Sequence, residues 1–269
     1  VASRGLGDVY KRQELIVVVS AMGKTTDQLM NNVSSLTPTP KDQELALLLT
    51  TGEQQTVSYL SMVLNDIGVN AKAMTGYQAG IKTVGHHLKS KIAEINPNIF
   101  NEAFKNHDIL VVAGFQGINE DFELTTLGRG GSDTTAVALA ASNQTPCEIY
   151  TDVDGVYATD PRILNEAKRL EYVSYEEMME MSALGAGVLE TRSVELAKNY
   201  DIPLYLGRTL SNVKGTWIMS KSDLLEKKAV TGVALDTHMM HVTISYPLPD
   251  NQLLTQLFTA LEELSLIHI

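Results

Sequence analysis

Short apolar runs alternate with amphipathic stretches along most of the chain. Runs dense in Val, Ile and Leu predict β-strands at 15–20, 69–74, 109–115, 148–151 and 202–206. Most of these runs do not alternate between polar and apolar residues, which is typical of strands covered on both faces. Apolar residues at helical spacing predict helices at 26–34, 57–67, 134–142 and 188–200, with Gly68 as the stop of the second. The alternation predicts an α/β fold with a mostly parallel, buried sheet.

A charged stretch without apolar periodicity, residues 221–228, predicts a domain boundary. Beyond it, residues 230–235 and 241–245 are predicted to be strands, and residues 252–264 an amphipathic helix. Only about 40 residues follow the boundary, which is small for an independent domain. We therefore expect a second domain that is cut short.

Composition narrows the classes of function. The chain has 269 residues, 44% hydrophobic and 20% charged, which is a normal balance for a soluble globular protein. No apolar run approaches the roughly 18 residues of a membrane-spanning helix, and residues 1–13 do not resemble a signal peptide. The net charge of −11 disfavours a nucleic-acid surface. It is compatible with a few basic groups that bind small anions locally. These features predict neither nucleic-acid nor membrane partners.

Cysteine and histidine usage bounds the compartment and the metals. Cys147 is the only cysteine, so no intramolecular disulfide forms and a reducing cytoplasm is the expected location. Two pairs of histidines lie close in sequence, but neither comes with a third candidate ligand. We therefore predict no protein-built metal site.

The segment Gly128–Ala136 carries the strongest chemical signal. Its glycines permit a tight turn and a close backbone approach to a ligand, and the Ala-rich run that follows predicts a helix. A Gly-rich turn that runs into a helix N-terminus presents free N–H groups to an anion such as a phosphate. A plain loop-to-helix turn is the alternative for the glycines alone. Arg129 and Asp133 favour function, because Arg clamps carboxylates and Asp orients groups around a transferring phosphoryl.

A second segment, residues 150–162, follows a predicted strand and is rich in carboxylates. Asp152, Asp154 and Asp160 crowd one loop at the carboxyl end of that strand, where open α/β sheets bind ligands. A solvated turn is the alternative, since Asp-Gly and Asp-Pro are turn signals. Calcium binding is disfavoured because the EF-hand spacing is absent.

Two weaker segments lie nearer the N-terminus. Residues 20–27 contain Gly-Lys-Thr, but a P-loop requires an upstream glycine where this chain has Val18, so Walker-type ATP binding is rejected. The segment remains a strand-end loop with hydroxyls and one cation. Residues 50–53 open the second predicted helix, and Glu53 alone would be read as a favourable first-turn acid.

Together these segments resemble the motifs of aspartate kinases, in the order of that family. They read SAMGKTTD (20–27), LLTTGE (48–53), AGFQG (113–117), TTLGRGGSDTTA (125–136) and TDVDGVYATDPR (151–162). The resemblance runs from about Glu14 to beyond Trp217. The combination of the fourth and fifth segments is highly specific.

The resemblance implies an amino-acid-kinase-like three-layer α/β/α sandwich, in which MgATP and aspartate meet above the carboxyl ends of the strands. It implies Asp133 and Arg129 as catalytic residues, with Glu53 holding the α-ammonium of aspartate and Arg129 its α-carboxylate. The implied aspartate-binding residues are Ser20, Lys24, Thr25, Thr26, Glu53, Phe115, Arg129, Gly130, Gly131 and Ser132. The implied ATP-binding residues are Thr151, Asp152, Tyr157, Ala158, Thr159, Asp160, Pro161 and Arg162. Mg²⁺ would be bound mainly through the nucleotide.

The resemblance also implies a domain plan: residues 1–13 unmatched, 14–225 an amino acid kinase catalytic domain, and 226–269 the start of a regulatory ACT domain. Full-length relatives take lysine or threonine as effectors, and a complete protein is expected to be a homo-oligomer. Three departures stand out. No Lys-Phe-Gly-Gly-Thr-Ser motif, whose Lys neutralises the transferred phosphoryl, precedes Glu14; Gly187 stands where some relatives carry a nucleotide-contacting Lys; and the chain ends early in the ACT region.

These departures set the expected activity. Residues 1–13 and 265–269 are expected to be foreign peptide. Without the phosphoryl-neutralising Lys, turnover is expected to be weak or absent. The function predicted is phosphoryl transfer from MgATP to the side-chain carboxylate of L-aspartate, the first step toward lysine, threonine and methionine. The alternatives are another acid kinase of the same fold and a non-catalytic ligand-binding fragment.

Overall fold

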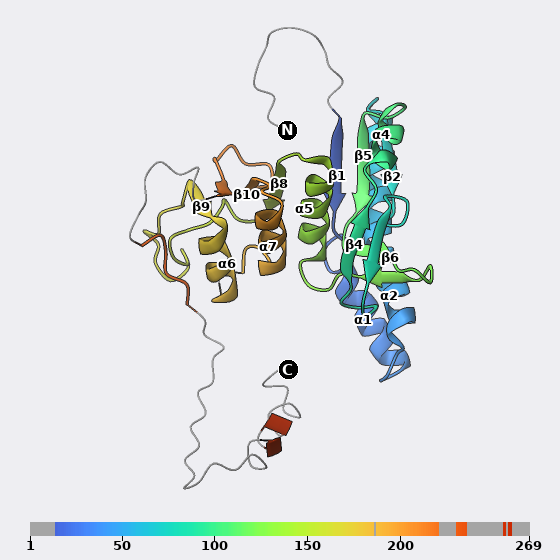
Figure 1. Cartoon of the computed structure of the whole chain (residues 1–269), viewed down its shortest axis with the longest axis horizontal. Helices are drawn as coiled ribbons and strands as arrows, with labels where there is room; N and C mark the ends of the chain where they lie inside the picture. Colours follow the sequence, from blue (N-terminus) through green and yellow to red (C-terminus); the bar gives the residue numbers. More distant parts are fainter. Residues whose placement is uncertain (1–13, 186, 221–229, 236–254, 257, 260–269) are drawn as a thin grey trace. The chain divides into compact units, whose positions relative to one another are not determined.

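The computed structural model describes residues 14–185, 187–220, 230–235, 255–256 and 258–259. The chain divides into two compact units, Val1–Leu235 and Asp236–Ile269, and every helix and strand named below belongs to the first (Figure 1). The strand predicted at 241–245 lies outside the described residues. So does most of the helix predicted at 252–264, although its described residues 255–256 and 258–259 are helical.

Three parallel strands form the first sheet, in the order β1-β5-β2. They are β1 (Leu15–Val19), β5 (Ile109–Ala113) and β2 (Ala71–Met74), and Ile109 of the central strand aligns with both Leu15 and Ala71. Helix α3 (Thr51–Asp66) packs against this sheet. Because Gly68 after it has φ 84°, the helix stops where the glycine predicts.

A second, mixed sheet has the order β4-β3-β6-β7. Its strands are short and were not predicted from the sequence, since three to five residues give little periodicity. They are β3 (Ile81–Val84), β4 (Lys91–Ile95), β6 (Gln116–Ile118) and β7 (Leu124–Thr126). The first and second sheets make up one half of this unit. Besides α3, its helices are α1 (Thr25–Leu36), α2 (Asp42–Leu49) and α4 (Asn98–Phe104).

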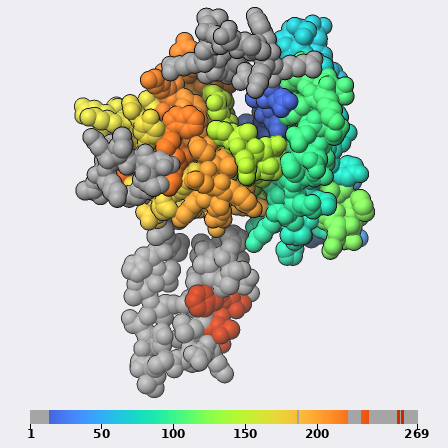
Figure 2. Space-filling model, turned by 45° about the horizontal axis from the view of Figure 1, so that its top comes forward, coloured from blue at the N-terminus to red at the C-terminus, as the bar shows by residue number. Residues whose placement is uncertain are grey.

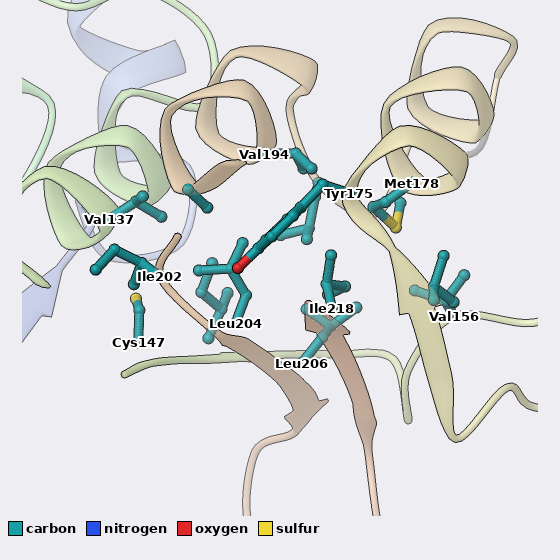
Figure 3. Close-up of a cluster of buried hydrophobic side chains, with 14 of the residues drawn as sticks. Val137, Cys147, Val156, Tyr175, Met178, Val194, Ile202, Leu204, Leu206 and Ile218 are labelled. Carbon is teal, nitrogen blue, oxygen red and sulfur yellow. The ribbon is translucent and has the colours of Figure 1, made fainter. Parts of the chain in front are cut away.

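The third sheet has the order β8-β10-β11-β9. It comprises β8 (Cys147–Thr151), β9 (Tyr172–Ser174), β10 (Leu204–Arg208) and β11 (Thr216–Met219). Helices α5 (Gly131–Asn143), α6 (Tyr175–Ala183) and α7 (Thr191–Asn199) belong to this half. Figure 3 shows the apolar core between these helices and strands, in which Val194 and Met178 face Leu204, Leu206 and Ile218. All five of these side chains are fully buried.

Helix α5 joins the halves of this unit. It packs against β1 of the first sheet, β8 of the third sheet and the neighbouring helix α7, and Figures 1 and 2 show α5 beside α7. Residues 136–141 in the middle of the helix are all Ala, Val or Leu, and seven residues of the helix are buried. A helix that is apolar on most sides is one that is packed on most sides, so its N-terminus has a fixed place between the two halves.

The α/β class and the mostly parallel strand pairing are confirmed, and each of the five predicted strands before residue 221 overlaps an observed one. The strand predicted at 230–235 is wrong. Residues 230–235 form no strand; they run along the loop after β8, where Val233 N–H donates to Ala158 O at 2.7 Å and the Thr231 hydroxyl donates to Glu177. The apolar residues Val230, Val233 and Leu235 are exposed, and no strand pairs with this segment among the described residues. Among the described residues, no helix has the length and apolar character needed to span a bilayer.

Candidate active site

The glycine-rich loop is built as the sequence predicts. Gly128 (φ 77°) and Gly130 (φ 62°) adopt left-handed backbone, and Gly130 is the N-cap of α5. In the first turn of that helix, the N–H groups of Ser132 and Asp133 have no backbone acceptor within the described part of the chain. Free N–H groups at the positive end of a helix dipole bind anions. The loop therefore has the geometry of an anion site.

The end of β5 interlocks with this loop. A Cβ on Gly131 would lie 2.8 Å from Phe115 Cδ2, and a Cβ on Gly114 would lie 2.7 Å from Ser132 Oγ. Such contacts are too close for any residue but glycine at either position. Phe115 itself has φ 68°, which is uncommon for a bulky residue. The structure thus packs Phe115 against Gly131, and Gly114 against Ser132.

The two N-terminal motifs also meet. Ala21 N–H donates to Glu53 Oε1 at 3.2 Å, and a Cβ on Gly52 would lie 2.8 Å from Ala21 Cβ and 3.9 Å from Thr26 Oγ1. Glu53 is 4% exposed, and its other oxygen, Oε2, is buried with no hydrogen-bond partner in the described structure. Burial, opposed by the hydrogen bond from Ala21, raises the pKa of the Glu53 carboxyl. An unpaired buried carboxylate oxygen is costly unless a ligand completes it.

Gln116 ties these two regions together. Its side chain is fully buried; Nε2 donates to Thr50 O at 3.0 Å, and Oε1 accepts from Gly76 N–H at 3.4 Å. Thr50 is the N-cap of α3, one turn before Glu53. The residue after Phe115 therefore fixes the start of the helix that carries Glu53. In the sequence, the only indication of a role for Gln116 was its position in the AGFQG segment.

Glu190 lies against the glycine-rich loop and was missed from the sequence. A Cβ on Gly130 would lie 2.4 Å from Glu190 Cβ and 3.5 Å from its Cδ. Burial, and secondly the negative charge of Glu190, raise the pKa of Asp133. Two carboxylates therefore flank the loop. No local pattern revealed Glu190, because it follows Gly130 by 60 positions in the sequence.

Arg192 is a second residue that the sequence did not reveal. Its guanidinium donates to Leu127 O and to Ser90 O, each at 3.0 Å. Leu127 immediately precedes the glycine-rich loop and Ser90 precedes β4, so α7 is tied to the opposite half of the fold. Arg is suited to this role because its fork of donors satisfies two acceptors at once.

The remaining predicted aspartate-binding residues lie at the surface. Ser20 and Lys24 are exposed after β1, and the Thr25 hydroxyl is used locally, donating to Met22 O at 2.7 Å. Arg129 is exposed, and no ion pair is formed by it within the described ranges. Its guanidinium is therefore available to a ligand.

The predicted nucleotide loop is held by contacts within it and by hydrogen bonds to two neighbouring segments. Asp160 holds Arg162 through Oδ2–Nη2 at 2.7 Å and Oδ1–Nε at 3.0 Å, and the Arg162 hydrogen bonds lower the pKa of Asp160. The Thr151 hydroxyl donates to Asp152 at 2.9 Å, and Tyr157 pairs with Arg169 in a β-bridge. Ala158 is bound on both sides, by Lys168 O and Val233 N–H. Among described residues, no hydrogen bond or ion pair joins this loop to residues 128–133.

Comparisons with known proteins find chains that are similar to this one. The sequence profile of the amino acid kinase family matches residues 4–208. Aspartokinase 2 of Bacillus subtilis is 46% identical over 244 residues, which are 90% of this chain and 60% of the relative. The chain thus spans about three-fifths of that relative's length.

Two solved structures are also similar. Aspartate kinase from Synechocystis has a TM-score of 0.67 at 41% identity, covering 82% of this chain and 36% of that one. Aspartokinase III of E. coli, solved with aspartate and ADP, has a TM-score of 0.61 at 26% identity, covering 73% of this chain and 46% of that one.

Proposed function

The chain belongs to the amino acid kinase family, and on that premise we propose that it is the catalytic part of an aspartate kinase, which transfers the γ-phosphoryl of ATP to the side-chain carboxylate of L-aspartate. Aspartokinase 2 of Bacillus subtilis is 46% identical to this chain, and aspartokinase III of E. coli was solved with aspartate and ADP. The proposal extends their substrates to this chain.

The observation that carries the proposal is the unpaired carboxylate oxygen of Glu53. It is buried at the junction of the 20–27 and 48–53 segments, where Ala21 N–H satisfies only the other oxygen. A primary ammonium supplies the missing donors and the opposite charge, which returns the raised pKa of Glu53 toward its ordinary value. Aspartate has such an ammonium, whereas N-acetylated acids lack it. This is the specific reason to favour aspartate over acetylated acid substrates.

The other end of the substrate is assigned to Arg129 and the first turn of α5. The exposed guanidinium suits a bidentate contact with the α-carboxylate. The acceptor carboxylate has an ordinary pKa of about 3.9, so it is ionised at neutral pH and needs no general base. The chain's contribution is then to position the acceptor and neutralise charge, the requirements of phosphoryl transfer. The free N–H groups of Ser132 and Asp133 supply such neutralisation.

The nucleotide is assigned to the loop after β8, with Thr151, Asp152, Tyr157 and Arg162 as its principal contacts. Asp160 presents the Arg162 guanidinium at the surface, where it is 89% exposed. Mg²⁺, when bound, neutralises charge on the phosphates. Such a cation would be held mainly through the nucleotide, and it would reduce the mutual repulsion of Asp133 and Glu190 beside the glycine-rich loop.

The same proposal covers regulation and location. Aspartokinase III of E. coli was also solved with lysine and aspartate. We extend lysine or threonine effectors, a homo-oligomer and a cytoplasmic location to the longer protein of which residues 226–269 begin a regulatory ACT domain. The domain plan, 14–225 catalytic and 226–269 regulatory, is part of the proposal.

A trapping assay with a panel of acceptors tests the function. Hydroxylamine converts an acyl phosphate into a hydroxamate that accumulates over hours, so slow turnover is detected. With MgATP, the proposal expects hydroxamate from L-aspartate and none from L-glutamate or N-acetyl-L-glutamate. Product from either of the latter acids, with none from aspartate, would establish the alternative acid kinase.

A further inference from the structure

Thr135 lies one turn inside α5 and is fully buried. Its hydroxyl oxygen accepts a hydrogen bond from Phe115 N–H at 3.1 Å, and the hydroxyl donates to Gly131 O at 2.8 Å. The directions are fixed, because an N–H group can only donate and a carbonyl oxygen can only accept. A single side chain therefore binds the backbone of two segments assigned to the substrate.

The bond matters because of the conformation of Phe115. A bulky residue at φ 68° is strained and persists only where its surroundings hold it. Two backbone bonds do so: Phe115 N–H donates to Thr135, and Phe115 O accepts from Leu127 N–H at 2.8 Å. The first partner lies on the buried helix α5 and also bonds Gly131 O, so it links Phe115 directly to the glycine-rich loop.

Displacement of Phe115 is transmitted directly to the loop. Phe115 Cδ2 and Cα fill the space that a Cβ on Gly131 would need, and Ser132 fills the equivalent space at Gly114. Packing this close leaves no slack to absorb a shift. We propose that Thr135 is a positioning residue for the aspartate site, holding Phe115 in left-handed backbone so that its ring and the Gly131–Ser132 turn keep their mutual geometry. The inference rests on the proposed function for the identity of the ligand.

Two substitutions at position 135 isolate the bond. Thr135→Val keeps the shape and β-branching of threonine but removes the acceptor, leaving the Phe115 N–H unpaired. Thr135→Ser keeps the hydroxyl and is the rescue. Thr134→Val is the matched control, because the neighbouring Thr134 hydroxyl also donates to the carbonyl four residues earlier, Gly130 O at 3.1 Å, yet forms no hydrogen bond with another segment among the described residues. If Thr135→Val does not fold, Thr135→Ala removes the same acceptor.

Two readouts are made on the whole 269-residue chain. The first is amide hydrogen exchange at Phe115, with Gly114 N–H as internal reference, since it donates to Val19 O at 3.0 Å and not to Thr135. The second is calorimetric affinity for L-aspartate. We expect Thr135→Val to speed exchange at Phe115 but not at Gly114 and to weaken aspartate binding about 10- to 100-fold. Thr135→Ser and Thr134→Val should stay within about threefold of the unmodified chain.

The outcomes separate this inference from the proposed function. Unchanged exchange at Phe115 in Thr135→Val overturns the inference. So does an unchanged aspartate affinity in that variant while the unmodified chain binds aspartate. If the unmodified chain binds no aspartate and exchange at Phe115 still rises, the proposed function fails while the anchoring of Phe115 by Thr135 stands.

Discussion

The backbone N–H of Ala21 donates to the Glu53 carboxylate at 3.2 Å, and this bond joins two segments that lie 32 positions apart in the sequence. It satisfies one carboxylate oxygen and leaves the other buried and unpaired among the described residues. A carboxylate in that state destabilises the fold unless it serves a ligand. Stability and binding are therefore expected to oppose each other at Glu53.

Replacing Glu53 by Gln should weaken aspartate binding by about 1.5–3 kcal/mol, because a charge-assisted contact with the ammonium is lost while the shape is kept. Calorimetric titration with L-aspartate measures the change. The double variant Glu53→Gln/Gln54→Glu is a useful control, since it adds a carboxylate at the neighbouring position without restoring the one at 53. Equal affinity in Glu53→Gln and the unmodified chain would remove Glu53 from the pocket.

The same substitution should change how stability depends on pH. Burial raises the pKa of Glu53 above its ordinary 4.5, so the folded state holds its proton more tightly than the unfolded state. Stability from this group is therefore greatest below pH 4.5 and falls as the pH rises through the folded-state pKa. Glu53→Gln removes that fall. The Tm of the variant minus that of the unmodified chain should rise with pH, and a flat difference would contradict the burial of an ionisable Glu53.

Arg129→Ala should raise the KM for aspartate and weaken its binding by about 1.5–3 kcal/mol, because a bidentate contact with the α-carboxylate is lost. The side chain is exposed, so little effect on Tm is expected. Arg162→Ala, on the nucleotide loop, is the control and should leave aspartate binding unchanged when no nucleotide is present. Normal aspartate binding in Arg129→Ala would show that the pocket is wrongly assigned.

Glu190→Gln should lower the pKa of Asp133. Burial is the main cause of the raised value and remains, but the second cause, the Glu190 charge, is removed. NMR titration of the Asp133 carboxyl carbon measures the pKa directly, and Gln keeps the packing against Gly130. Glu195→Gln, on the same helix but without an influence on Asp133, is the control. If both variants titrate alike, Glu190 does not act on Asp133.

Arg192→Met should destabilise the fold by about 1.5–3 kcal/mol, since two carbonyls lose their donor and Ser90 is buried. Thermal or urea unfolding measures the loss. Arg162→Met, whose side chain is 89% exposed, provides the matched control and should change stability by less than about 0.5 kcal/mol. Similar losses of unfolding free energy in both variants would show that the hydrogen bonds from Arg192 contribute little to holding the two halves together.

The sequence predicted the elements that have a strong local signal. Strand β5 is a run of buried apolar residues, and α3 has helical spacing and the Gly68 stop, so both were found. Strands β6 and β7 have three residues each and depend on pairing with each other, which no local pattern encodes. Residues 230–235 have the composition of a strand but pair with no strand in the part of the chain that the structure describes, and tertiary context decides such cases.

The site divides in the same way. The glycines of the loop at Gly128–Gly131 predict a tight turn from the sequence alone, and the positive φ values of two of them confirm that turn. Glu190, Arg192 and Thr135 act on that loop through contacts across the fold or across a helix turn. None of these three residues belongs to a recognisable motif for its role. Glu190 and Arg192 contact residues that are distant in the sequence, and Thr135 bonds backbone groups. Local pattern therefore finds the loop but not the residues that hold it.

Calorimetric titration with L-aspartate and N-acetyl-L-aspartate tests the central claim most directly, because the two ligands differ at the ammonium assigned to Glu53. The account predicts saturable binding of L-aspartate at one site per chain, with N-acetyl-L-aspartate weaker by at least about tenfold. Binding of the acetylated acid as tight as that of aspartate, or tighter, would contradict the account.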